Sequence, residues 1–235
     1  MTPLGTELAA NERAAIAALW LQRARSESSV GCVFAQLADE LAATGAHPEV
    51  VALARVATGD EARHAASCLA LAAAYGAEAP AIEPAAVRLP DYTAEAKLRA
   101  TLHAVNLCCI GETIATAFVE ACVGACQDGA LRDLHGRHLA DEIRHARVGW
   151  AHVATLDAAE RATVAGWLPQ VLEAQLRAWE RRIDELPAAG FPGHGYPPRA
   201  ALLETVRAAV RELVLPGFAH VAIDASAAAA WFAAQ

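Results

Sequence analysis

The sequence predicts an all-α protein, and three observations carry that prediction. Hydrophobic residues make up 55% of the chain and many are alanine, which packs helices closely at little cost in side-chain entropy. Apolar residues recur every three or four positions over long stretches, as on one face of a helix. A five-residue segment occurs twice, as Asp-Glu-Ala-Arg-His at 60–64 and Asp-Glu-Ile-Arg-His at 141–145. Such a repeat usually marks two copies of one structural unit, here a helical hairpin.

Composition and charge exclude several classes of protein. The chain has 19 basic and 27 acidic residues, a net charge of −8, and no cluster of Lys and Arg, so we expect no nucleic-acid partner. Its six cysteines form no Cys-x-x-Cys pair and are expected to be reduced, buried thiols. The N-terminus lacks a secretory pattern, and Glu112, Glu120 or Asp224 interrupts the longest apolar segments. We therefore expect a soluble cytoplasmic protein without a membrane span.

Two helices are predicted in the first hairpin. The first runs from about residue 6 to 43 and is stopped by Thr44-Gly45; the second starts at His47-Pro48, with proline near its first turn. The inward stripe of the first comprises Ile16, Leu19, Arg23, Glu27, Val30, Phe34 and Leu37. That of the second comprises Val50, Leu53, Ala57, Glu61, His64, Cys68, Leu71 and Tyr75.

A proline-containing crossover at 76–91 leads to the second predicted hairpin. Its first helix runs from about 92 to 127, and Gly129 begins the second. The stripe of the first comprises Leu98, Val105, Cys109, Glu112, Thr116, Val119 and Val123. The stripe of the second comprises Leu131, Leu134, His138, Glu142, His145, Gly149, His152 and Leu156. Residues 1–157 would thus form a four-helix bundle.

Further helices are predicted in residues 158–235, which we place in the same domain. A fifth helix covers 158–185, a Gly/Pro-rich loop covers 187–198, and a sixth helix covers about 199–214. Pro216-Gly217 is expected to break the chain before a short apolar terminal helix. These helices either pack over the bundle or form an oligomer contact, such as that of a homodimer.

Ionisable groups on the apolar stripes are the main indication of function. In each repeat the Glu and His of Glu-x-x-His lie about 60° apart on one helical face. A buried carboxylate costs several kcal/mol unless it is protonated, paired or bound to a cation. The groups expected to converge are Glu27, Glu61, His64, Glu112, Glu142 and His145. Like charges at that density require a cation among them.

The spacing of these residues is similar in the two hairpins. Glu27 precedes Glu61 by 34 residues and Glu112 precedes Glu142 by 30, so each hairpin places a lone Glu and a Glu-x-x-His at a similar depth. Two helices that each donate a Glu and two that each donate Glu-x-x-His form the ligand set of ferritin-like dimetal carboxylate bundles. Oxygen-rich ligation with two imidazoles favours two iron ions, with manganese as the alternative.

With these residues, the chain resembles the ferritin-like diiron superfamily over about residues 20 to 150. The repeated Asp-Glu-x-Arg-His and the segment Gly-Glu-Thr-Ile-Ala-Thr at 111–116 resemble the hydroxylase subunits of bacterial multicomponent monooxygenases. That resemblance implies a role for Thr116 in proton and oxygen handling. It also places Cys68, one turn after His64, where methane monooxygenase has a cysteine. Both residues also have a plain interpretation, Thr116 as a hydroxyl bonded to a helical carbonyl and Cys68 as a small core residue.

His138 gives the second repeat the longer pattern His-x-x-x-Glu-x-x-His. This pattern is similar to that of the arylamine N-oxygenases, whose diiron site takes an extra imidazole from this position. Ala57 stands at the matching place in the first hairpin, so the asymmetry would belong to one metal. His138 is equally well explained as a histidine bonded to a carboxylate in the core.

The acid and base that flank each ligand pair are also repeated. Asp60 and Asp141 either orient a ligand histidine or form surface ion pairs with Arg63 and Arg144, and their repetition favours the first role. Arg23, one turn before Glu27, either pairs with it or extends to the surface.

The leading functional hypothesis is a non-haem diiron oxygenase or oxidase that activates O₂ to oxidise a small organic substrate. The resemblance at His138 implies N-oxygenation of an amine, with hydroxylation next. The chain has no flavin, nicotinamide or iron–sulfur motif, so electrons would come from an external donor protein or from the substrate. The alternatives are a ferritin-like ferroxidase or iron-handling protein, and a binding module whose metal site has decayed.

Overall fold

The computed structural model describes residues 4–78 and 89–235, and their regular secondary structure is helical, which confirms the all-α class. Over these ranges no strand forms, and β-pairing is limited to two isolated bridges, between Cys126 and Gly193 and between Phe191 and Tyr196. Of the predicted crossover at 76–91, Pro80 and Pro84 lie outside the described residues. The ferritin-like arrangement of the helices stays a prediction.

Contacts divide the chain into two compact units. The first unit contains residues 1–36 and 54–89, and the second contains residues 37–53 and 90–235. Most of the first hairpin thus belongs to the first unit, whereas the second hairpin and the C-terminal helices belong to the second. The division at residue 157 predicted from the sequence stays a prediction.

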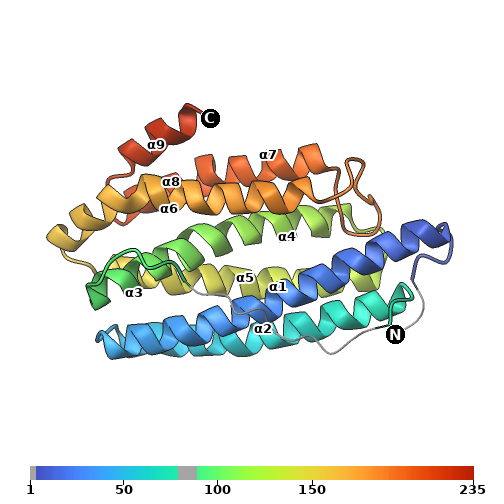
Figure 1. The fold of residues 1–235 in the computed structure, drawn as a ribbon, viewed down its shortest axis with the longest axis horizontal. Coiled ribbons are helices and arrows are strands. Elements are labelled where there is room, and N and C mark those ends of the chain that lie inside the picture. The colour runs from blue at the N-terminus through green and yellow to red at the C-terminus, as the bar shows by residue number, and fades with distance from the viewer. Residues whose placement is uncertain (1–3, 79–88) are drawn as a thin grey trace. The chain divides into compact units, whose positions relative to one another are not determined.

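The first hairpin consists of α1 (Ala10–Ala43) and α2 (Pro48–Ala74), which lie side by side (Figure 1). The turn between them uses Gly45 at φ +76°, a conformation that favours glycine. Within the first unit the two helices approach closely at Gly31, where an added Cβ would lie 3.2 Å from the Cβ of Glu61. The small residue therefore lets α1 pass directly over the ligand-bearing turn of α2.

The second hairpin begins with one continuous helix made of α3 (Ala96–Ala104), η1 (Val105–Glu112) and α4 (Thr113–Ala125). It starts at Ala96, later than predicted, because the Glu95 side chain accepts hydrogen bonds from the first free backbone N–H groups. The predicted helix is present, and its middle part, η1, is a π-helix that periodicity did not reveal. The Gln175 side chain donates to the backbone carbonyl of Asn106 at 2.9 Å and so satisfies a group within the widened turn.

Helix α5 (Gly129–Ala154) packs along this helix inside the second unit. Its first turn is capped by Asp128, which accepts from the backbone N–H of Leu131 at 2.8 Å. An added Cβ on Gly149 would lie 2.7 Å from the backbone nitrogen and the sulfur of Cys109. All eight positions of the predicted inward stripe are buried.

The C-terminal helices also belong to the second unit. They are α6 (Ala158–Asp184), α7 (Arg199–Ala209), η2 (Val210–Val214), α8 (Leu215–His220) and α9 (Ser226–Ala233). Helix α7 packs on α4 and α6, and α9 packs on α6.

The break predicted at Pro216-Gly217 is wrong, because the helix continues through it to His220. The π-turn of η2 ends two residues before the proline, and a widened turn accommodates the missing N–H group and the ring. Gly217 serves packing instead: an added Cβ would lie 2.7 Å from the Trp150 ring. The chain turns only at Ala222, which has φ 58°.

The helix Ala96–Ala125 is long and apolar enough to cross a membrane by length and composition, with a mean hydropathy of 1.5 in its most apolar window. Glu112 and Glu120 interrupt its apolar sequence but do not take it out of this range. However, 61% of that window is buried inside the protein. Packing against neighbouring helices of the second unit accounts for its apolar character.

Candidate metal centre

The first unit holds a buried group of three ligand residues, which we call the first triad: Glu27, Glu61 and His64. Glu27 comes from α1, and the other two come from α2. One ligand atom of each lies within 4.8 Å of the others. Nδ1 of His64 lies 3.6 Å from Oε2 of Glu61. The helical spacing of Glu-x-x-His therefore aligns a nitrogen and an oxygen, and α1 adds a second carboxylate.

The second unit holds an equivalent group, the second triad: Glu112, Glu142 and His145. Glu112 is the last residue of η1, and the other two come from α5. Their ligand atoms also lie within 4.8 Å of one another. Nδ1 of His145 lies 3.2 Å from Oε2 of Glu142 and 4.0 Å from Oε2 of Glu112. Each unit thus presents the same set of donors, two carboxylates and one imidazole.

These separations fit a bound metal ion. Protein ligands bind divalent transition metals at roughly 2.1 Å, so two ligand atoms at a right angle lie about 3.0 Å apart. The Glu–His separations of 3.6 Å and 3.2 Å are close to that value. All six residues are buried, the most exposed being Glu27 at 9%. The two buried clusters could therefore each hold a metal ion, and a cation would offset the desolvation of their carboxylates.

The acid and base flanking each ligand pair interact in the same way in both units. Asp60 pairs with Arg63, and Asp141 pairs with Arg144. Asp60 is buried with its side chain only 3% exposed, so its ion pair is not simply a surface pair. The further role of these carboxylates in orienting a histidine stays a prediction.

Arg23 pairs with Glu27, one of the two roles considered for it from the sequence. Its Nε donates to Oε1 of Glu27 at 2.8 Å, and both side chains are nearly buried, at 11% and 12% exposure. The guanidinium also lies 5.7 Å from the centroid of the Trp20 ring. A fixed cation therefore borders the first triad.

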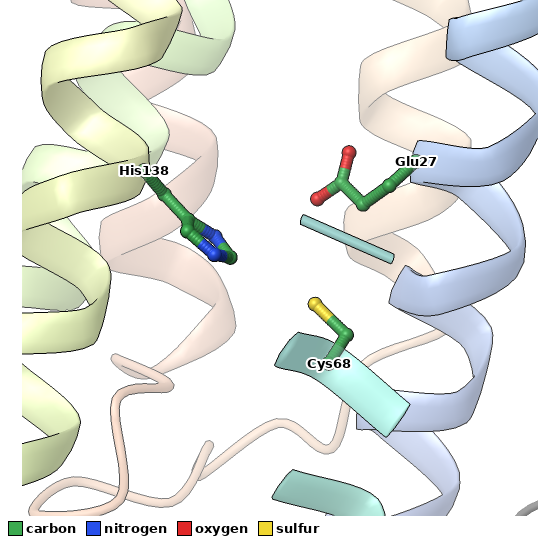
Figure 2. Close-up of side chains that lie close together, drawn as sticks. All are labelled: Glu27, Cys68 and His138. Atoms are coloured by element: carbon green, nitrogen blue, oxygen red, sulfur yellow. The ribbon is translucent and has the colours of Figure 1, made fainter. Parts of the chain in front are cut away.

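Two further predicted site residues, Cys68 and His138, are buried. Figure 2 shows Cys68 on α2 and Glu27 on α1, whose ligand atoms lie within 4.8 Å of each other. The same view labels His138 on α5, a residue 3% exposed whose ring centroid lies 6.5 Å from that of His135. His138 is not a member of the second triad. Its role as a metal ligand stays a prediction.

Thr116 makes the hydrogen bond to a helical carbonyl that is one of its two predicted roles. Its hydroxyl donates to the backbone carbonyl of Glu112 at 2.8 Å. The sequence analysis did not identify Thr113, which directly follows Glu112. Its hydroxyl accepts a hydrogen bond from the Trp150 indole N–H at 3.1 Å. No local pattern could reveal it, because Trp150 comes from another helix.

Two buried histidines, His103 and His152, have hydrogen-bond partners in the second unit. The ring of His103 lies between a carboxylate oxygen of Glu40 at 2.5 Å and the carbonyl of Pro90 at 2.8 Å. Nε2 of His152 lies 3.0 Å from the Thr101 hydroxyl. Burial lowers the pKa of His152 to about 4. These partners are remote in sequence, so spacing alone could not identify them.

Cys108 lies one turn before Glu112. Its thiol is fully buried, and burial, followed by the nearby Glu112 carboxylate, raises its pKa well above the usual value. The group beside this part of the second triad is therefore a neutral thiol.

In comparisons with known proteins, no family model, curated protein or solved structure matches this chain.

Proposed function

We propose that the protein is a non-haem diiron oxygenase or oxidase that acts on a small organic molecule. The observation that carries the proposal is the presence, in each unit, of a buried triad of two carboxylates and one imidazole. Ligand sets rich in oxygen with an imidazole suit iron or manganese better than zinc or copper. When bound, two ferrous ions would supply the electron transfer that activates dioxygen.

The residues of the chain would bind and tune those ions. Glu27, Glu61 and His64 would hold one ion, and Glu112, Glu142 and His145 would hold the other. Carboxylates can bind through one or two oxygens, so the ligand sets can adapt as the charge on the ions changes. The ion pairs Asp60–Arg63 and Asp141–Arg144 fix the helical turns that carry the ligands.

The specific reaction that we propose is N-oxygenation of an amine. Its support is the pattern His138-x-x-x-Glu142-x-x-His145, together with the burial of His138 on the same helix as the second triad. An added imidazole would make one ion richer in nitrogen than the other. Electrons beyond those held by two ferrous ions would come from a separate donor protein or from the substrate.

Anaerobic reconstitution with ferrous iron, followed by mixing with oxygenated buffer, tests the proposal. We expect two iron ions per chain, rapid oxygen uptake and a transient visible absorbance. Glu142→Gln should lower the iron content and abolish the transient, because a ligand of the second triad loses its charge. Glu120→Gln, at an exposed position of α4, should behave as the unmodified protein. A reconstituted protein without iron or oxygen uptake would refute the proposed function.

A further inference from the structure

The two triads have the same donors but different neighbours one turn before the lone glutamate. In the first unit this neighbour is Arg23, whose Nε lies 2.8 Å from Oε1 of Glu27. In the second unit it is Cys108, a fully buried thiol one turn before Glu112. One triad is therefore bordered by a permanent positive charge and the other, at the corresponding place, by a neutral group.

The Asp–Arg pair beside each Glu-x-x-His is the same in the two units. Each Glu-x-x-His is preceded by an aspartate that pairs with the arginine three residues later, as Asp60–Arg63 and Asp141–Arg144. Both arginines of these pairs are about half exposed or more, at 62% and 48%, so solvent screens them. Arg23 is only 11% exposed and lies against Trp20, so solvent screens its charge far less.

We propose that Arg23 makes metal binding ordered, so that the second triad takes up its ion first and tightly and the first triad takes up its ion last and weakly. The inference rests on the metal binding in the proposed function. Arg23 weakens metal binding at the first triad in two ways. Its guanidinium repels a divalent cation through a poorly screened medium, and its hydrogen bond draws charge from the Glu27 carboxylate that the ion would use.

Arg23 borders the first triad only, through its hydrogen bond to Glu27. The first triad therefore becomes the site where an ion is added or lost, and Arg23 becomes the positioning residue that sets its affinity.

Titration of the metal-free full-length protein with Mn²⁺ tests the order of binding, with calorimetry to measure affinity and electron paramagnetic resonance to count free Mn²⁺. We expect two steps with dissociation constants at least tenfold apart. Arg23→Gln should tighten the weak step at least tenfold and leave the tight step unchanged. Arg23→Lys keeps the charge and should stay close to the unmodified protein. Arg25→Gln, at an exposed position of α1, is the matched control and should change neither step.

Ligand variants assign the steps to the triads even where an Arg23 variant folds poorly. Glu27→Gln should remove the weak step, and Glu112→Gln should remove the tight step. Two equal steps in the unmodified protein, the reverse assignment, or a weaker second step in Arg23→Gln would overturn the inference while leaving the proposed function intact. If the protein bound no Mn²⁺ and no ferrous iron, both would fail.

Discussion

At the scale of single residues, the repeated Glu-x-x-His shows how much of a metal site helical geometry can define. The three-residue spacing places Glu61 beside His64 and Glu142 beside His145, as the sequence predicted. The third member of each triad comes from a different helix, and it was predicted only because each lone glutamate interrupts an apolar stripe. Sequence spacing could not show whether Arg23 pairs with Glu27 or extends to the surface, because a long side chain can do either.

His152 makes the stability of the second unit depend on pH. Its pKa is about 4 in the folded chain, below the ordinary value of 6.5, because burial disfavours the charged ring. Between these values the unfolded chain binds a proton that the folded chain does not, so stability present above pH 6.5 is lost as the pH falls to 4. We expect the free energy of unfolding to fall by about 3 kcal/mol from this residue over that range.

Urea denaturation in the presence of a chelator, at several pH values, measures this contribution. His152→Gln should lose it, because glutamine does not titrate, whereas His220→Gln, at an exposed position, should keep the pH dependence of the unmodified protein. The charged neighbours Glu160 and Lys97 act on His152 in opposite directions and stay in place in both variants. An unchanged pH dependence in His152→Gln would show that this histidine does not contribute.

At the scale of helices, periodicity predicted the main elements well because each helix buries one face. Periodicity did not predict the backbone conformation where a residue distant in sequence determines it. The π-turn of η1 places a carbonyl against Gln175, 69 residues away from Asn106, and the continuous helix through Pro216 depends on the widened turn of η2. A Pro-Gly pair usually ends a helix. Here the helix continues, and Gly217 packs against the Trp150 ring.

The contact between α5 and the helix before Glu112 depends on Gly149. A Cβ there would lie 2.7 Å from the Cys109 nitrogen and 2.8 Å from the Ala104 carbonyl oxygen, and backbone atoms cannot simply rotate away. Gly149→Ala should therefore lower the free energy of unfolding by about 1–3 kcal/mol. Gly166→Ala, in α6 with nothing within 4 Å, should instead be neutral or stabilise by up to about 1 kcal/mol. Equal urea midpoints for the two variants would contradict the close packing.

At the scale of the whole molecule, buried carboxylates should make stability depend on metal. An ion that binds only the folded chain stabilises it by about 2.7 kcal/mol at a hundredfold excess over its dissociation constant. For a chain of this size that corresponds to a rise in Tm of about 5–10 °C. We expect this rise with Mn²⁺, and a smaller one in Glu61→Gln and in Glu142→Gln. A melting curve that Mn²⁺ leaves unchanged would indicate that the triads bind no ion.

The repeat also explains why a candidate metal centre could be located without a matching relative. Two copies of one pattern, each with a lone glutamate at a similar distance, predicted six converging ligands, and each compact unit brings three of them together. The convergence of all six stays a prediction. The sequence contains no comparable repeated pattern for binding a substrate or an electron donor. Their assignment therefore depends on the reactions of the iron-bound protein.

The most direct test of the central claim is a crystal structure of the iron-loaded protein with anomalous diffraction recorded at the iron absorption edge. We predict two anomalous peaks per chain, one bound by Glu27, Glu61 and His64 and the other by Glu112, Glu142 and His145. The absence of both peaks, with the carboxylates paired to protein cations or directed into solvent, would contradict the account.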